Sequence, residues 1–92
     1  MGQEDKTTRK ATQRAIMAAE RGDAQALYNL GLFYSTGYHV NRDYVEAHKW
    51  LNLAAINGVP RAMADRADLA REMSPQEIAH AQRAAREWKA RH

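Results

Sequence analysis

The sequence of 92 residues contains no cysteine, and this absence excludes several kinds of site. Without thiols there is no disulfide framework, no thiolate metal site and no nucleophilic cysteine. The chain also lacks any run of about 18 apolar residues, and no apolar segment follows its polar N-terminus, so we expect neither a membrane-spanning helix nor a signal peptide. Together these absences favour a cytoplasmic protein that makes no membrane contact.

Aromatic residues are also scarce, at 8% of the chain, although apolar residues reach 45%. Much of the apolar total is alanine. A chain of this length has room for one core, and small side chains fill a core only where the elements approach closely. We therefore expect a single domain of helices that pack through small side chains.

The excess of positive charge is small and local. The formal net charge is +3, and most of it comes from four basic residues near the C-terminus. These are Arg83, Arg86, Lys89 and Arg91, which outnumber Glu87. Basic residues in a last helical turn complement the helix dipole, and the total charge is too small for wrapping a polyanion. We therefore do not expect a nucleic-acid partner, although the basic tail leaves nucleic acid as a weaker alternative.

Apolar residues recur at intervals of three and four along five segments, and no stretch shows the alternation typical of a strand. The pattern predicts helices over residues 9–21, 23–36, 43–56, 60–73 and 74–91. Glycines follow the first three helices and are expected to end them. Ser74-Pro75-Gln76-Glu77 predicts a capping box with proline at the start of the last helix. Residues 1–8 lack this pattern and are expected to be disordered.

Two helices carry expectations about their packing. Gly31 lies inside the second helix, where its missing side chain lets a neighbouring helix come close. In the fourth helix the spacing of apolar residues predicts an inner face. That face consists of Met63, Ala67, Ala70 and Met73, with Leu69 alongside.

The sequence repeats itself with a period of 36 residues. Ala19-x-x-Gly22-x-x-Gln25-Ala26-Leu27 aligns with Ala55-x-x-Gly58-x-x-Arg61-Ala62-Met63. One helix pair with its turns fills this period, and a unit of that size cannot bury its apolar face alone. Successive pairs must therefore stack, which predicts a short superhelical solenoid.

The residues of one period resemble the Sel-1-like repeat family, a branch of the tetratricopeptide-type solenoids. The family pattern appears here as Gly22, Ala26, Leu30, Gly31, Tyr34, Gly37, Val40, Asp43, Ala47, Trp50, Ala54, Ala55, Gly58 and Ala62. The resemblance implies an all-α fold, namely a short right-handed α–α superhelix of five helices. It also implies a scaffold or adaptor role in protein complexes, without any reaction.

The resemblance divides the chain into unequal units. Residues 9–21 match the second half of a missing unit, and residues 23–58 form a complete repeat. Residues 59–73 form a degenerate unit, and residues 74–91 form a C-terminal capping helix. His39 stands where the family usually has a second loop glycine, so we expect the loop backbone to be rearranged there.

No group of residues carries the pattern of a catalytic or metal site. The four histidines share no ligand spacing, so we expect them to be exposed and no zinc to bind. Asp65 and Asp68 are three residues apart, but arginines surround them, which favours an exposed ion-pair lattice over acid–base chemistry. These arginines are Arg61, Arg66 and Arg71. We therefore expect no enzyme activity, no cofactor and no small-molecule substrate.

In the tetratricopeptide relatives the first helix of each pair lines a concave surface, and this register implies a groove. The residues that would line it are Gln25, Tyr28, Leu32 and Ser35, with Arg61, Asp68 and Arg71 as a charged rim. An apolar patch on a concave wall is typical of a peptide site. The alternative is that Tyr28 and Leu32 pack as core against the helix of residues 9–21, and the sequence favours neither.

The predicted function is therefore a protein-interaction module that binds a peptide or a helix of a partner protein in the groove. The alternative is a structural role, as a segment of a longer solenoid or by self-association. The helix of residues 9–21 favours this alternative because it lacks the first half of its unit.

Overall fold

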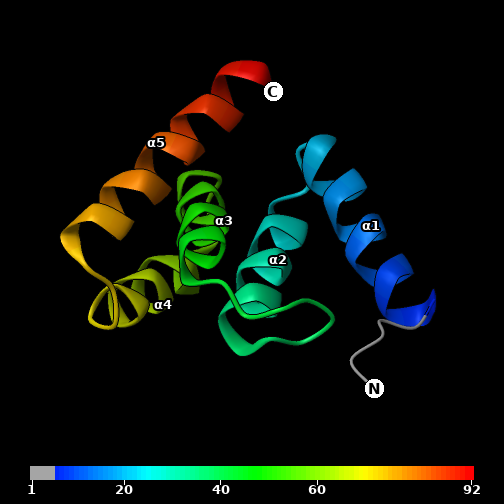
Figure 1. The fold of residues 1–92 in the computed structure, drawn as a ribbon. Helices are drawn as coiled ribbons and strands as arrows, with labels where there is room; N and C mark the ends of the chain where they lie inside the picture. The colour runs from blue at the N-terminus through cyan, green and yellow to red at the C-terminus, as the bar shows by residue number, and fades with distance from the viewer. Residues whose placement is uncertain (1–5) are drawn as a thin grey trace.

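The computed structural model describes residues 6–92, which form five helices (Figure 1). They are α1 (Lys6–Glu20), α2 (Ala24–Thr36), α3 (Tyr44–Ile56), α4 (Pro60–Ala70) and α5 (Pro75–Arg91). No strand occurs among the described residues, and the prediction of an all-α fold is confirmed. α1 begins earlier than predicted, so residues 6–8 are helical, while the rest of the segment predicted to be disordered lies outside the described residues.

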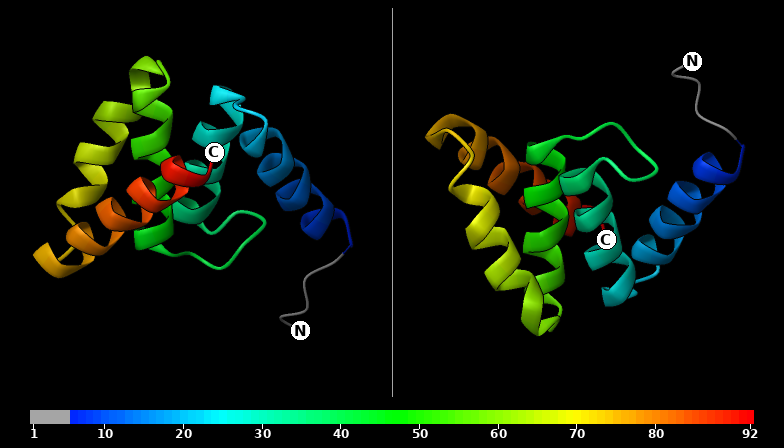
Figure 2. Two further views of the ribbon diagram at one scale, coloured as in Figure 1. Left: turned by 90° about the horizontal axis from the view of Figure 1, so that it is seen from above. Right: turned by 90° about the horizontal axis from the view of Figure 1, so that it is seen from below.

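The helices stack around α3. Three helices, α2, α4 and α5, pack against α3, and α1 packs mainly against α2. Figures 1 and 2 show α1 and α5 on opposite sides of the central α2–α3 hairpin. This is the arrangement of a short helical solenoid, as predicted from the period of the sequence.

The helix ends follow the predicted local chemistry. Asp23 and Asp43 cap α2 and α3, because their carboxylates accept hydrogen bonds from backbone N–H groups in the first turn. Ser74 forms the predicted capping box with Glu77 at the start of α5. Gly37, with a φ of +78°, ends α2 in the left-handed conformation.

The loop between α2 and α3 holds His39 in a backbone conformation that glycine favours. The φ of His39 is +71°, which costs a residue with a β-carbon about 1–2 kcal/mol. The ring centroid of His39 lies 3.9 Å from that of Tyr38 and 5.0 Å from that of Phe33. The Thr12 hydroxyl also donates a hydrogen bond of 3.4 Å to the carbonyl oxygen of His39. These contacts hold the histidine in a glycine-like conformation, so the loop does not need the rearrangement that we expected.

Close approach between α2 and α3 forms the centre of the core. Leu30, Leu51 and Leu53 are its largest fully buried side chains. Gly31 faces Leu51, and a β-carbon on Gly31 would lie 2.6 Å from Cδ2 of that leucine. The prediction that Gly31 lets a neighbouring helix come close is confirmed.

α4 turns a different face inward from the predicted one. Met73 is buried as expected, but the side chain of Met63 is 60% exposed and Ala67 is exposed. Leu69 is buried as expected beside that face, and Ala62 is buried in place of Met63. The prediction is wrong for Met63 because the small Ala62 side chain, next to it on the helix, allows α4 to approach α3 closely and takes the inner position.

Candidate partner-binding surfaces

The residues predicted to line the groove lie on two helices that a hydrogen bond joins. Gln25, Tyr28, Leu32 and Ser35 lie on α2, and Arg61, Asp68 and Arg71 lie on α4 and at its C-terminal end. The Tyr28 hydroxyl donates to Oδ2 of Asp65 on α4 at 2.5 Å, across 37 positions of sequence. Among the predicted residues, the exposed ones are Gln25, Arg61, Asp68 and Arg71, and the half-buried ones are Leu32 and Ser35.

Tyr28 itself belongs to the core. Its side chain is 8% exposed, and the Asp65 carboxylate accepts a hydrogen bond from its hydroxyl group. The hydrogen bond to this carboxylate, followed by burial, raises the pKa of Tyr28 above its ordinary value. The prediction that Tyr28 projects into a groove is therefore wrong. Tyr28 is part of the core, as the alternative expected, but its hydroxyl contacts α4 and not the helix of residues 9–21 that the alternative named. Leu32 is half-buried against the same core, so the apolar part of the surface is smaller than predicted.

Polar side chains of α4 bind neighbouring helices and not one another. Asp65 accepts a hydrogen bond from the Tyr28 hydroxyl on α2. The Arg66 guanidinium donates a hydrogen bond to Oδ1 of Asn52 on α3. In the part of the chain that the structure describes, the recorded ion pair lies within α3. The ion-pair lattice predicted around Asp65 and Asp68 is therefore wrong. These polar groups instead fix the position of α4 against the central hairpin.

The hairpin of α2 and α3, with the loop between them, matches the family model of the Sel1 repeat over residues 24–59. Residues 24–59 form a Sel1 repeat. The resemblance seen in the sequence is thereby confirmed, while the division of the remaining chain into partial units stays a prediction. Sel1 repeats are non-catalytic modules that generally mediate protein–protein interactions.

Two further findings concern the chain that carries this Sel1 repeat. No curated protein matches the chain. Within residues 6–92, none of the helices has both the length and the apolar character needed to cross a bilayer.

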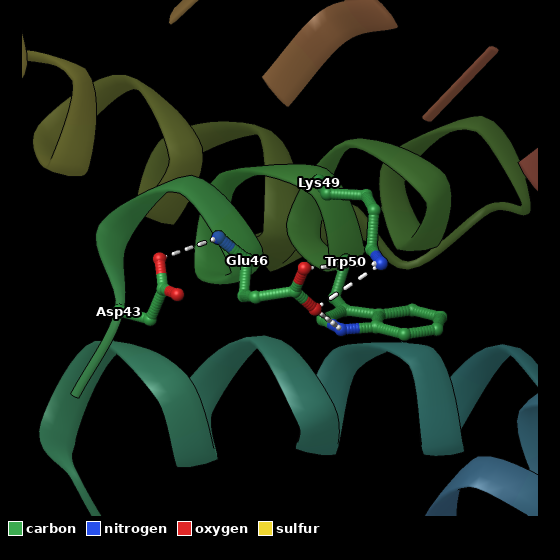
Figure 3. Close-up of polar contacts among 4 residues, drawn as sticks. All are labelled: Asp43, Glu46, Lys49 and Trp50. Carbon is green, nitrogen blue, oxygen red and sulfur yellow. Dashed lines mark hydrogen bonds and ion pairs between the residues drawn. The ribbon is translucent and has the colours of Figure 1, made fainter. Parts of the chain in front are cut away.

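A polar network on α3 holds the tryptophan of the Sel1 repeat in place (Figure 3). Glu46 accepts a hydrogen bond of 3.1 Å from Nε1 of Trp50 and forms an ion pair of 3.1 Å with Lys49. The Lys49 ammonium lies 4.2 Å from the centroid of the Trp50 ring, within the range of a cation–π contact. The buried Trp50 ring in turn packs edge-on against Trp88 of α5, with centroids 4.7 Å apart. The network therefore orients the face that α3 presents to α5.

Replacing Tyr28 with phenylalanine is expected to lower the free energy of unfolding by about 1–2 kcal/mol, because the Asp65 carboxylate loses its donor. Asp65 is half-buried, so water replaces part of the lost bond and keeps the effect in this range. Urea unfolding followed by circular dichroism measures the loss. Asp65→Asn, which keeps an acceptor for the hydroxyl, should cost less. A Tyr28→Phe variant as stable as the parent would show that the bond does not hold α2 to α4.

The Sel1 repeat contains a buried histidine that was not predicted from the sequence. His48 is 3% exposed, and its Nδ1 has no hydrogen-bond partner among the described residues. Burial, and then the positive charge of Arg66, lower the pKa of His48 below its ordinary value. The expectation that the histidines are exposed is therefore wrong for His48. The described residues contain no group of three histidine or carboxylate side chains placed to hold a metal ion.

A pocket that the sequence did not predict lies where α1, α3 and α5 end. Its volume is about 340 Å³, and apolar side chains from α2, α3 and α5 line it, among them Leu27, Leu53, Ile56 and Trp88. Charged residues at its edge include Arg21 and Lys89. The lining combines three stretches that are distant in sequence, residues 19–27, 53–57 and 88–92, so no local motif could have indicated it. The part of the molecule that the structure describes therefore offers two candidate surfaces, the face of α2 and α4 and this pocket.

Proposed function

We propose that the chain is an adaptor or scaffold module that binds a peptide or a helix of a partner protein across α2 and α4. The Tyr28–Asp65 hydrogen bond is the observation that supports this proposal best, because it holds the two helices together. The bond uses the inward-facing groups of both helices, so the exposed side chains beside it are available to a partner. The presence of a Sel1 repeat supports the class of function.

The face of α2 and α4, here called the α2/α4 surface, consists of Gln25, Leu32, Ser35, Arg61, Asp68 and Arg71. Leu32 supplies apolar area at its centre, and the amide of Gln25, which donates to Asn29 at 3.2 Å, offers polar groups for orientation. Of the three charged residues in this set, two are arginines and one is an aspartate, so the set carries a net charge of +1, while α4 itself holds two arginines and two aspartates. The surface is therefore matched to a partner segment with one apolar residue and an excess of acidic ones.

Amide shifts of labelled protein during titration with a peptide from a co-purified partner test this proposal. Shifts should concentrate on α2 and α4, and Leu32→Asp should weaken binding by about tenfold or more. Arg61→Glu should also weaken it, whereas Arg91→Glu on α5, with the same charge change at another exposed site, should not. Shifts confined to other helices, or unchanged affinity of Leu32→Asp, would exclude the α2/α4 surface.

A structural role is the second candidate, and the exposure of Met63 favours it. Met63 stands 36 positions after Leu27, which is 3% exposed, yet the Met63 side chain is 60% exposed. A further stacked helix would cover Met63 as other helices cover Leu27. Sedimentation tests this role, because self-association should occur and should be lost in Met63→Glu. A monomer at high concentration would rule out assembly of this chain with itself.

A further inference from the structure

The pocket at the ends of α1, α3 and α5 is separate from the α2/α4 surface, and none of the residues of that surface lines it. α1 packs mainly against α2, and α5 packs mainly against α3, so the ends of these two outer helices leave a space between them. Both the front view and the view from above show the end of α5 close to the turn that follows α1 (Figures 1 and 2). The resulting pocket of about 340 Å³ lies near the lower limit of ligand-site volumes, about 300 Å³. This volume suits one large side chain better than a whole ligand.

The last turn of α5 creates one wall of the pocket. α5 has 17 residues, whereas the corresponding helix of the Sel1 repeat, α3, has 13. The additional length carries Trp88, whose ring meets that of Trp50 in the middle of α3 edge-on. The His92 ring stacks on Trp88 with centroids 3.7 Å apart, which braces the indole at the pocket wall.

The floor of the pocket is apolar and partly open to solvent. Leu27 and Leu53 form its buried base, at 3% and 2% exposure. Ile56 lies at the open side with 53% of its side chain exposed, although it belongs to the same lining. An apolar side chain that entered the pocket would cover Ile56 and remove this surface from water, which is favourable by about 25 cal/mol per Å².

Charge next to the pocket is positive and extends along one helix. Arg83, Arg86 and Lys89 follow one another at intervals of three on α5, all exposed, and Arg21, in the turn after α1, lines the pocket together with Lys89. Arg21 and Lys89 have no recorded ion pair within residues 9–92. Glu20 is the acidic residue in the lining and reduces the positive charge only in part.

The helix ends determine which part of a partner can enter. Three helix C-termini meet at the pocket, and each carries a partial negative charge, so the pocket disfavours an anionic group inside it. The basic row on α5 lies outside the pocket and attracts anions. The two effects together select an uncharged apolar side chain that is followed by acidic residues.

We propose that this pocket binds one aromatic or large aliphatic side chain of an acidic peptide segment from a partner protein, with the acidic residues lying along Arg83, Arg86 and Lys89. The proposal shares with the proposed function the assumption of a protein partner with an apolar residue in an acidic segment, but it does not depend on the α2/α4 surface. An aromatic anchor would bury about 150–250 Å² of its own area in such a site.

The test uses the full chain and three short synthetic peptides: an acidic one with a single tryptophan, the same peptide with alanine instead, and a basic one with tryptophan. The first should shift the methyl signals of Leu27, Leu53 and Ile56 and should bind about tenfold or more tightly than the second. The basic peptide should bind more weakly than the acidic one, and added salt should weaken the binding of the acidic peptide. Equal binding of the tryptophan and alanine peptides, or shifts that spare these methyl groups, would overturn the proposal.

Matched variants assign the effect to the pocket. Ile56→Ser removes apolar area at a half-exposed position, and Lys89→Glu reverses one charge of the row. Each variant should lower the affinity for the acidic tryptophan peptide about three- to tenfold. Arg91→Glu, about 200° around the helix from Lys89, should leave its binding unchanged. Leu32 is not among the residues that line the pocket, so Leu32→Asp should not affect binding of this peptide. Loss of binding in Leu32→Asp with none in Ile56→Ser would assign the peptide to α2 and α4 and contradict the pocket.

Discussion

Replacing Gly31 with alanine is expected to lower the free energy of unfolding by about 1–3 kcal/mol, the cost of adding a methyl group to a packed core. The new β-carbon would lie 2.6 Å from Cδ2 and 2.7 Å from Cγ of Leu51, and 3.3 Å from its backbone nitrogen. Leu51 is 1% exposed and cannot move into solvent, so α2 and α3 must separate. Alanine favours a helix over glycine by about 1 kcal/mol, which offsets only part of this cost. Urea unfolding followed by circular dichroism measures the result.

A double-mutant cycle identifies the cause of that loss. In a Leu51→Ala background the two side-chain atoms that the new methyl group would meet are absent and only the backbone nitrogen at 3.3 Å remains, so Gly31→Ala should destabilise the protein far less. The helix propensity of alanine should then dominate, and the double variant should be as stable as Leu51→Ala alone or slightly more stable. If Gly31→Ala left the stability unchanged in the presence of Leu51, the close contact between α2 and α3 would be contradicted.

Acidification is expected to destabilise the protein through His48. Its pKa is lower in the folded state than the ordinary value of 6.5, so the unfolded chain binds a proton more readily. The neutral histidine therefore contributes its full stability above about pH 6.5, and this contribution is lost as the pH falls toward the lower folded pKa. Over that interval the free energy of unfolding should fall by up to about 1.4 kcal/mol per pH unit. Urea unfolding at a series of pH values measures this slope.

Two variants separate His48 from the other titrating groups. His48→Leu removes the buried titratable ring and its unpaired Nδ1, so it should flatten the slope and leave the protein at neutral pH as stable as the parent or more stable. His80→Gln removes a histidine that is exposed on α5 and should keep the slope. A His48→Leu variant with the same acid dependence as the parent would show that another group causes it.

Local chemistry in the sequence was sufficient to predict the helices. Asp23 and Ser74 cap helices through contacts within one turn, and Gly37 ends α2 through its own backbone freedom, so each signal can be read without knowledge of the fold. The close approach at Gly31 was predictable for a related reason. A glycine inside a helix has few structural roles other than to let a neighbouring helix approach closely.

The packing partners of each helix could not be predicted from the same signals. His48 is buried because α2, α4 and α5 surround α3, and periodicity along α3 alone does not show how many neighbours it has. Met63 was expected inside because it is large and apolar, but the position beside it, Ala62, takes that place. Tyr28 was ambiguous in the sequence because its burial depends on Asp65, which lies 37 residues away.

The candidate surfaces depend on these long-range contacts. All six residues of the proposed α2/α4 surface come from the register of the repeat, whereas Tyr28, which the register placed among them, is buried in the core. The pocket was not predicted, because it requires the ends of three helices and the additional turn of α5 to meet. Its most informative residue, Ile56, looks in the sequence like an ordinary last residue of a helix.

Both surfaces rest on the claim that α4 and α5 stack on the central hairpin in the observed register, and nuclear Overhauser contacts in solution test that claim most directly. We expect contacts between the indole protons of Trp50 and Trp88, and between the ring protons of Tyr28 and the backbone of α4 near Asp65. A solution structure in which α5 leaves Trp50 uncovered, or in which Tyr28 makes no contact with α4, would contradict the account.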